Sequence, residues 1–189
     1  MRGMNYQDYI WDLGGTLLDN YELSTQAFIQ TLKEFELSGS HDAVYQKLKE
    51  STEIAVETFA ASEPGFLQRY KHNEAKKLAN PIWKEGAKEI LKKIVASGSR
   101  NFLISHRDQQ VLFLLAQAEL LDYFTEVVTA ANGFARKPNP ESIIYLKDKY
   151  HIDNALVIGD REIDHLAGQK AGCDTLIVDE KKSLLEIVK

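Results

Sequence analysis

Short apolar runs alternate with helical patterns along the C-terminal two-thirds of the chain. The runs lie at residues 102–104, 127–128, 155–158 and 175–178. Each is followed by apolar residues at the three- or four-residue spacing that gives a helix one apolar face. Strands that alternate with helices in this way are typical of a parallel sheet with helices on both faces. With a first strand at 9–11, the pattern predicts an α/β fold with a Rossmann-like, doubly wound parallel sheet.

Residues 20–80 interrupt this alternation, because they contain no strand-like run. Apolar side chains recur there at helical spacing, and the Glu-Pro-Gly sequence at 63–65 marks a break between helices. We therefore predict two structural parts. Residues 1–18 and 81–189 form a sheet core, and residues 19–80 form a small helical insert.

Two helix starts can be predicted within the insert, because apolar residues step at helical spacing from Phe28 and again from Val44. The side chains of Asp, Asn, Ser and Thr favour the position before a helix, where they accept hydrogen bonds from its free N–H groups. We expect Asp19 or Asn20 to cap the first helix and Asp42 to cap the second.

The composition narrows the range of functions without changing the predicted fold. Of the 189 residues, 44% are hydrophobic and 27% are charged, and the net charge is −5. Such an acidic chain has no electrostatic reason to bind nucleic acid or an anionic membrane. The single cysteine, Cys173, excludes a disulfide within this chain and fits a reducing cytoplasm. We expect neither a signal peptide nor a membrane span, and the pattern indicates no particular oligomeric state.

Four groups of polar residues follow predicted strands, whose carboxyl ends would share one edge of the sheet. The first group is Asp12 with Gly14 and Gly15, where a carboxylate stands beside backbone that a phosphate can approach closely. The second is Ser105, whose hydroxyl can bind phosphate oxygens. Taken separately, the first group is better explained as an Asp in a tight turn, and a serine after a strand more often caps a helix.

The third group is Lys137, which Pro138 holds extended. Lysine is a compact cation suited to phosphate and to crowded carboxylates, although most lysines are solvated on the surface. The fourth group is Asp160 and Asp164, two acids four residues apart at the start of a predicted helix. They could share Mg²⁺, which takes oxygen ligands and keeps substrate phosphate in its shell, or they could simply favour the helix N-terminus.

Together, the four groups resemble the four motifs of the haloacid dehalogenase superfamily, in the same order along the chain. Residues 164–172 are similar to the family's last core helix, and residues 80–86 to its return from cap to core. The helical insert lies where the branch that includes phosphoglycolate phosphatase and β-phosphoglucomutase carries its cap. The resemblance covers nearly the whole chain, and it implies a Mg²⁺-dependent phosphohydrolase acting on a small phosphorylated metabolite.

The resemblance also implies a role for each matching residue. Asp12 would attack phosphorus and form an aspartyl-phosphate, which water then hydrolyses. Ser105 and His106 would bind phosphoryl oxygens, and Lys137 would neutralise charge between Asp12 and the phosphate. The insert would act as a cap that excludes water and selects the substrate. Mg²⁺ would be held by Asp12, the Gly14 carbonyl and Asp160, and by Asp164 either directly or through water.

One position departs from the family pattern. Phosphatases of this family carry a second Asp two residues after the nucleophile, which protonates the leaving group, and here that position is Gly14. General acid–base help contributes about 10²–10⁴-fold, far less than the whole acceleration of phosphate ester hydrolysis. The glycine therefore predicts a slow or selective phosphatase that works best on good leaving groups, such as acyl or aryl phosphates.

Three alternatives follow from the glycine. His106 could supply the missing acid. The chain could act like a phosphonate hydrolase that uses a cap lysine, Lys47 or Lys49, as a Schiff base, whereas the acidic pair argues against a dehalogenase. It could also be a catalytically impaired relative that binds Mg²⁺ and a phosphorylated ligand without turnover. The pattern does not distinguish a sugar phosphate, phosphoglycolate or a nucleotide as the substrate.

Overall fold

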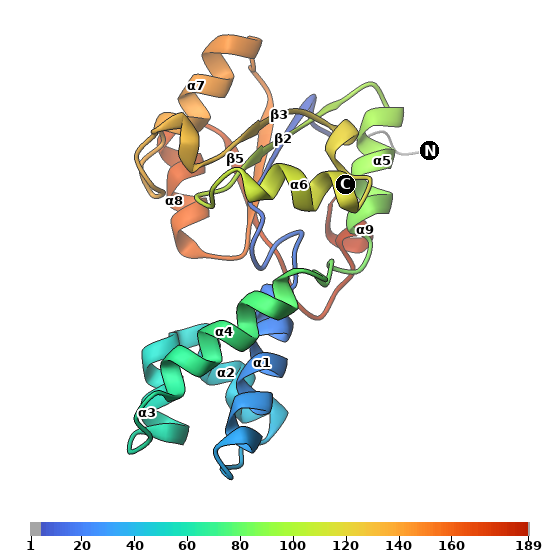
Figure 1. Cartoon of the computed structure of the whole chain (residues 1–189). Helices are drawn as coiled ribbons and strands as arrows, with labels where there is room; N and C mark the ends of the chain where they lie inside the picture. The colour runs from blue at the N-terminus through green and yellow to red at the C-terminus, as the bar shows by residue number, and fades with distance from the viewer. Residues whose placement is uncertain (1–4, 189) are drawn as a thin grey trace. The chain divides into compact units, whose positions relative to one another are not determined.

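The computed structural model describes residues 5–188, which form the two compact units drawn in Figure 1. The sheet unit comprises the described parts of Met1–Leu18 and Trp83–Lys189, and the helical unit comprises Asp19–Ile82. The described residues of the sheet unit form five parallel strands in the order β3-β2-β1-β4-β5. This arrangement confirms the predicted α/β class and the Rossmann-like parallel sheet. The strands are β1 (Asp8–Trp11), β2 (Arg100–Ile104), β3 (Phe124–Val128), β4 (Ala155–Gly159) and β5 (Asp174–Ile177).

Successive side chains of a strand point to opposite faces of the sheet. Because the strands carry apolar side chains on both faces, helices cover both. Tyr9 and Trp11 face α5, α6 and α9, whereas Ile10 and Phe102 face α7 and α8. Figure 1 shows α7 and α8 on one side of the strands and α5 and α9 on the other. The helical elements of this unit are α5 (Ala87–Ala96), α6 (Gln110–Gln117), α7 (Glu141–Tyr150), α8 (Glu162–Lys170) and α9 (Leu184–Ile187), with the 3-10 turns η1 (Leu121–Tyr123) and η2 (Ala130–Asn132).

Strand β1 lies at the centre of the sheet, with β2 and β3 on one side and β4 and β5 on the other. Its last residue, Trp11, pairs in register with Leu103 of β2 and Ile158 of β4. The segments that follow these three strands therefore emerge along one edge of the sheet. In an open parallel sheet, ligands bind at this edge, beside the point where the strand order reverses.

The helical unit is built around a cluster of aromatic rings. The Phe28 ring makes edge-to-face contacts with Phe59, Phe66 and Tyr70, at centroid distances of 6.1, 5.0 and 5.1 Å. None of the helices formed by residues 5–188, in either unit, combines the length and apolar character that crossing a membrane requires. The helices of this unit are α1 (Asn20–Glu34), α2 (His41–Glu50), α3 (Thr52–Ala60) and α4 (Phe66–Leu78).

The start of α1 agrees with prediction, and the start of α2 does not. The Asp19 side chain accepts a hydrogen bond from Glu22 N–H at 3.2 Å, so it caps α1. Helix α2 is capped by Ser40, whose hydroxyl accepts from Ala43 N–H at 3.3 Å. The prediction of Asp42 was wrong because the helix begins one residue after the serine, which leaves Asp42 inside the first turn. An acid there still favours the positive end of the helix dipole.

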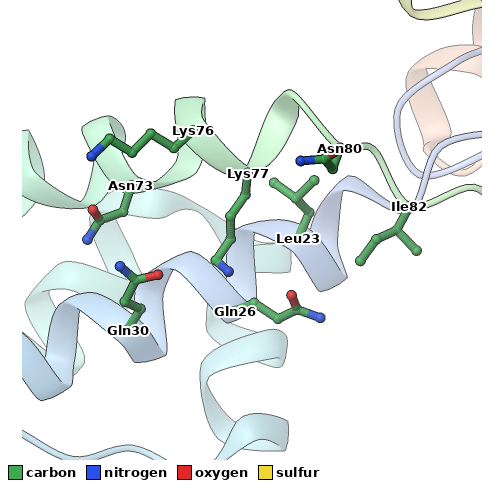
Figure 2. Close-up of a pocket in the computed structure, with 8 residues that line it drawn as sticks. All are labelled: Leu23, Gln26, Gln30, Asn73, Lys76, Lys77, Asn80 and Ile82. Carbon is green, nitrogen blue, oxygen red and sulfur yellow. The ribbon is translucent and has the colours of Figure 1, made fainter. Parts of the chain in front are cut away.

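A pocket of about 390 Å³ lies between α1 and α4 within the helical unit (Figure 2). In Figure 2, Lys77 extends from α4 toward α1, between Gln26 and Gln30. The Gln26 amide donates to Glu22 at 2.9 Å, and the Gln30 amide donates to Glu34 at 3.2 Å. The two glutamines of the lining are thus already engaged in hydrogen bonds along α1. The lining residues are Leu23, Gln26, Gln30, Asn73, Lys76, Lys77, Asn80 and Ile82.

The close packing of Gly168 in α8 against the sheet supplies a test. A Cβ added to Gly168 would lie 2.4 Å from Thr175 Cγ2 and 3.1 Å from Val157 Cβ. We expect Gly168→Ala to lower the free energy of unfolding by about 1–3 kcal/mol through overpacking, even after a gain of about 1 kcal/mol in helix propensity. Urea unfolding measures this, with the exposed Gln169→Ala as the control. A Gly168→Ala protein as stable as the control would contradict the packing of α8.

Candidate active site

Asp12 follows β1 and is fixed to the neighbouring strand. Its N–H donates to the Ile158 carbonyl of β4 at 2.8 Å, so the carboxylate projects from the centre of the sheet edge. The chain then turns sharply, because three successive N–H groups, at 16–18, donate to the single carbonyl of Leu13. Gly15 lies in this turn with φ of 82°, a conformation that favours glycine. The sequence offered two interpretations of this stretch, a carboxylate at a strand end and a tight turn, and the structure contains both.

Lys137 holds two carboxylates together. Its Nζ lies 2.5 Å from Asp12 Oδ1 and 2.5 Å from Asp164 Oδ1. The Lys137 side chain is only 5% exposed, so it is no solvated surface lysine. An ammonium buried at this depth is tolerated because it is paired and hydrogen-bonded. Lys137 thereby joins the loop before α7 to the end of β1 and to the first turn of α8.

Three acids converge at this edge. Ligand oxygens of Asp12, Asp160 and Asp164 lie within 4.8 Å of one another, and this is a group that could hold a metal ion. The Thr16 hydroxyl lies between two of them, 3.4 Å from Asp12 Oδ2 and 3.5 Å from Asp160 Oδ1. The sequence assigned Thr16 no role of its own. Its place four residues after Asp12 was the available signal, since a tight turn brings positions at that spacing back together.

The position of Asp164 depends on a glycine. Its second carboxylate oxygen accepts from Arg161 N–H at 3.2 Å, which holds the carboxylate at the start of α8. A Cβ added to Gly159 would lie 2.3 Å from Asp164 Cβ, so only glycine leaves room for this carboxylate. The sequence pattern assigned Gly159 no role, because a close approach between two residues five apart leaves no local signal.

The electrostatics of the site are unbalanced. Burial, followed by the charges of Asp12 and Asp164, raises the pKa of Asp160 from 3.8 to about 7. Burial also raises the pKa of Asp12, although the Lys137 ammonium opposes the shift. Burial acts to lower the pKa of Lys137, but the two carboxylates outweigh it and raise that pKa. Three carboxylates and one ammonium give −3 + 1 = −2 when all are ionised. One divalent cation would balance that excess.

Ser105 and His106 lie on the loop after β2, beside Lys137. The Ser105 hydroxyl oxygen accepts from Arg107 N–H at 3.2 Å, which leaves its O–H free to donate to a ligand. His106 Nε2 accepts a hydrogen bond from the Lys137 backbone N–H at 3.0 Å. His106 thus links the loop that carries Ser105 to the segment that carries Lys137. Gly14 lies in the turn after Asp12, where it pairs with Leu18, and contributes no side chain.

Comparisons with known proteins agree with this geometry. The family model described as haloacid dehalogenase-like hydrolase matches residues 9–178. The crystal structure of a hydrolase from Streptococcus pneumoniae TIGR4 is 54% identical to this chain, with a TM-score of 0.91, and the match covers 97% of this chain and 96% of that one.

Two curated relatives match over similar lengths. A phosphoglycolate phosphatase from Psychrobacter arcticus is 29% identical, over 92% of this chain and 83% of the relative. A pyrophosphatase PpaX from Oceanobacillus iheyensis is 25% identical, over 93% of this chain and 84% of the relative. The family model spans most of the chain, and its description agrees with the resemblance found in the four motifs. The chain belongs to the haloacid dehalogenase-like hydrolase family.

Proposed function

We propose that this protein is a Mg²⁺-dependent phosphatase of a small phosphorylated metabolite, with Asp12 as its nucleophile. The observation that carries the proposal is the contact of Lys137 Nζ with both Asp12 and Asp164, beside Asp160. The phosphatase and pyrophosphatase names of the curated relatives support the same class of substrate. We also propose that residues 19–80 act as the substrate-selecting cap, and that the enzyme works in the cytoplasm.

The donor set at the sheet edge fits Mg²⁺. Carboxylate oxygens are the ligands that this ion prefers, and the excess charge of the three acids matches its own. Asp12, Asp160 and Asp164 would hold the ion, together with the Gly14 carbonyl. When bound, Mg²⁺ neutralises charge on the phosphoryl group and on the acids around it.

The chain's own residues divide the chemistry between them. An Asp12 carboxylate oxygen forms a bond to phosphorus while the bond to the leaving-group oxygen breaks. Lys137 remains beside Asp12 and neutralises charge there, and the Ser105 O–H donates to a phosphoryl oxygen. Water then hydrolyses the aspartyl-phosphate and releases phosphate. Gly14 supplies no proton in either step, so the leaving group must depart with little acid assistance.

The phosphonate hydrolase alternative is disfavoured by the state of the lysine it would need. A lysine that forms a Schiff base must give up its proton, usually by desolvation in an apolar pocket. Lys47 is instead partly exposed to solvent on α2, and its ammonium forms an ion pair with Glu50 at 2.8 Å, so it does not lie in an apolar pocket. The alternative of a binding protein without turnover is decided by the assays below.

Replacing the nucleophile tests the proposal directly. With Mg²⁺ and an aryl or acyl phosphate, we expect Asp12→Asn to lower kcat by at least about 10⁴-fold, because the amide cannot attack phosphorus. Chelation of Mg²⁺ should also abolish turnover of the wild type. The exposed Asp153→Asn serves as the control and should retain full activity. Activity that survives Asp12→Asn would contradict the assignment of the nucleophile. Binding of phosphorylated metabolites without any turnover would favour the binding protein.

Restoring the missing acid tests the role of Gly14. We expect Gly14→Asp to raise kcat on alkyl phosphates by up to about 10²-fold, since their poor leaving groups need a proton. The same variant should gain little on aryl phosphates, whose leaving groups depart unprotonated. The ratio of the two rates, measured in wild type and variant, isolates proton transfer from any change in folding. Equal effects on both substrates would show that residue 14 is not where the proton is lacking.

The crowded acids predict a dependence of stability on pH. The Asp160 pKa is raised from 3.8 to about 7, so the stability that its protonated form provides is present below pH 3.8 and lost as the pH rises through about 7. In the presence of a chelator, the wild type should therefore unfold more easily at about pH 8 than at about pH 5.

The Asp160→Asn variant removes this charge and should be inactive yet more stable. We expect a gain on the order of 2 kcal/mol at about pH 8 in chelator, and a flatter pH profile. Thermal unfolding across pH measures both quantities, and Asp153→Asn is again the control. A wild-type profile that is as flat as that of Asp160→Asn would argue against repulsion among these acids.

A further inference from the structure

His106 makes a hydrogen bond that fixes which of its nitrogens carries a proton. Its Nε2 lies 3.0 Å from the backbone nitrogen of Lys137. A backbone N–H can only donate, so Nε2 must be the acceptor and must carry no proton. The proton of the neutral imidazole then resides on Nδ1.

The surroundings of His106 favour this neutral form. Burial lowers the His106 pKa from 6.5, the positive charges of Lys137 and Arg136 lower it further, and the Asp164 carboxylate acts in the other direction. The loop that carries His106 is also held firmly. Ser105 N–H donates to the Val128 carbonyl at 2.9 Å on one side of it, and Ala130 N–H donates to the Arg107 carbonyl at 2.8 Å on the other.

The segment that carries Lys137 needs such an anchor, because residues 133–137 lie between β3 and α7 without regular structure. Two side chains accept hydrogen bonds from backbone N–H groups of this segment. Glu141 accepts from Ala135 N–H at 2.7 Å, and His106 accepts from Lys137 N–H itself. Only the second bond restrains the residue whose ammonium lies between Asp12 and Asp164.

We propose that His106 is a positioning residue, whose neutral imidazole holds the Lys137 backbone so that the ammonium stays between the two carboxylates. The importance of this contact for turnover rests on the proposed phosphatase function, but the contact itself does not. In this role His106 is not the surrogate acid for Gly14. Its Nε2 is an acceptor, and the remaining Nδ1–H of a neutral imidazole is a weak acid.

Protonation of His106 would break the contact, because a proton on Nε2 would face the Lys137 N–H. Glutamine separates the need for a hydrogen-bond acceptor from the need for a titrating imidazole. Its amide oxygen reaches about as far as Nε2, accepts a hydrogen bond and does not titrate. Asparagine reaches only as far as Nδ1, and leucine fills space without an acceptor. The variants His106→Gln, His106→Asn and His106→Leu therefore form a graded series.

The first measurement is structural and needs no substrate. Imidazole nitrogen shifts of ¹⁵N-histidine-labelled protein at neutral pH distinguish the two neutral tautomers, and a His106→Gln sample identifies the resonances of His106. We expect the Nδ1–H tautomer, with protonation only below the ordinary histidine pKa. An Nε2–H tautomer would overturn the proposal whatever the activity of the protein.

The second measurement is kinetic, with Mg²⁺ and an aryl phosphate. We expect kcat to fall about tenfold in His106→Leu and His106→Asn, as for loss of one hydrogen bond, while His106→Gln stays close to wild type. The loss of kcat at acid pH should shrink in His106→Gln, and Tm values show whether each variant is folded. The exposed His72→Leu is the control and should be unchanged.

The outcomes separate this inference from the proposed function. A folded His106→Gln protein as slow as His106→Leu would overturn positioning, and would favour an imidazole that contacts phosphate. Full activity in His106→Leu would overturn it as well. If the wild type hydrolyses nothing, the proposed function fails, and the tautomer alone then decides whether His106 holds Lys137.

Discussion

The Lys137 ammonium is the charge on which the rest of the site depends. It is nearly buried, and its Nζ contacts carboxylates that follow two different strands. An unpaired carboxylate at this depth costs several kcal/mol, so Asp12 and Asp164 can share the edge of the sheet only with a cation between them. A single ammonium cannot balance three acids, however. Burial and the excess negative charge raise the pKa of Asp160, and the same cluster is one that could hold a divalent ion.

The fold creates this crowding by topology rather than by local sequence. Strand β1 is central, and the strands on either side of it end in register with it, so residues 12, 105 and 160 emerge at one edge although they are far apart in the chain. The loops are then tied together by hydrogen bonds that their backbone N–H groups donate, one to a carbonyl and one to the His106 side chain. Asp12 N–H is held by β4, and Lys137 N–H is held by the loop after β2. The backbone at Asp12 and at Lys137 is therefore held by contacts additional to the ion pairs of their side chains.

The sequence predicted what depends on local pattern. Buried strands between helices leave continuous apolar runs, so the sheet and the residues at its strand ends could be recognised, Asp12 and Asp160 among them. The features that the sequence did not predict depend on contacts between residues that lie apart along the chain, or on the local backbone geometry. The need for Gly159 arises from the carboxylate of Asp164, and the hydrogen bond of His106 arises from a loop that begins beyond β3. The cap of α2 was misplaced because Ser40 and Asp42 are both good capping residues, and only backbone geometry chooses between them.

The glycine at position 14 separates two tasks that a phosphatase normally combines. Among the described residues, the contacts that hold Asp12, Lys137 and Asp164 involve no side chain from position 14, so the charge-balancing part of the site is intact without it. Under the proposed phosphatase function, what position 14 lacks is a side chain that could transfer a proton to the leaving group. The barrier then depends on how well the leaving group of the substrate carries negative charge by itself. Selectivity would in that case arise at the sheet edge from leaving-group chemistry, in addition to any selection by the helical unit.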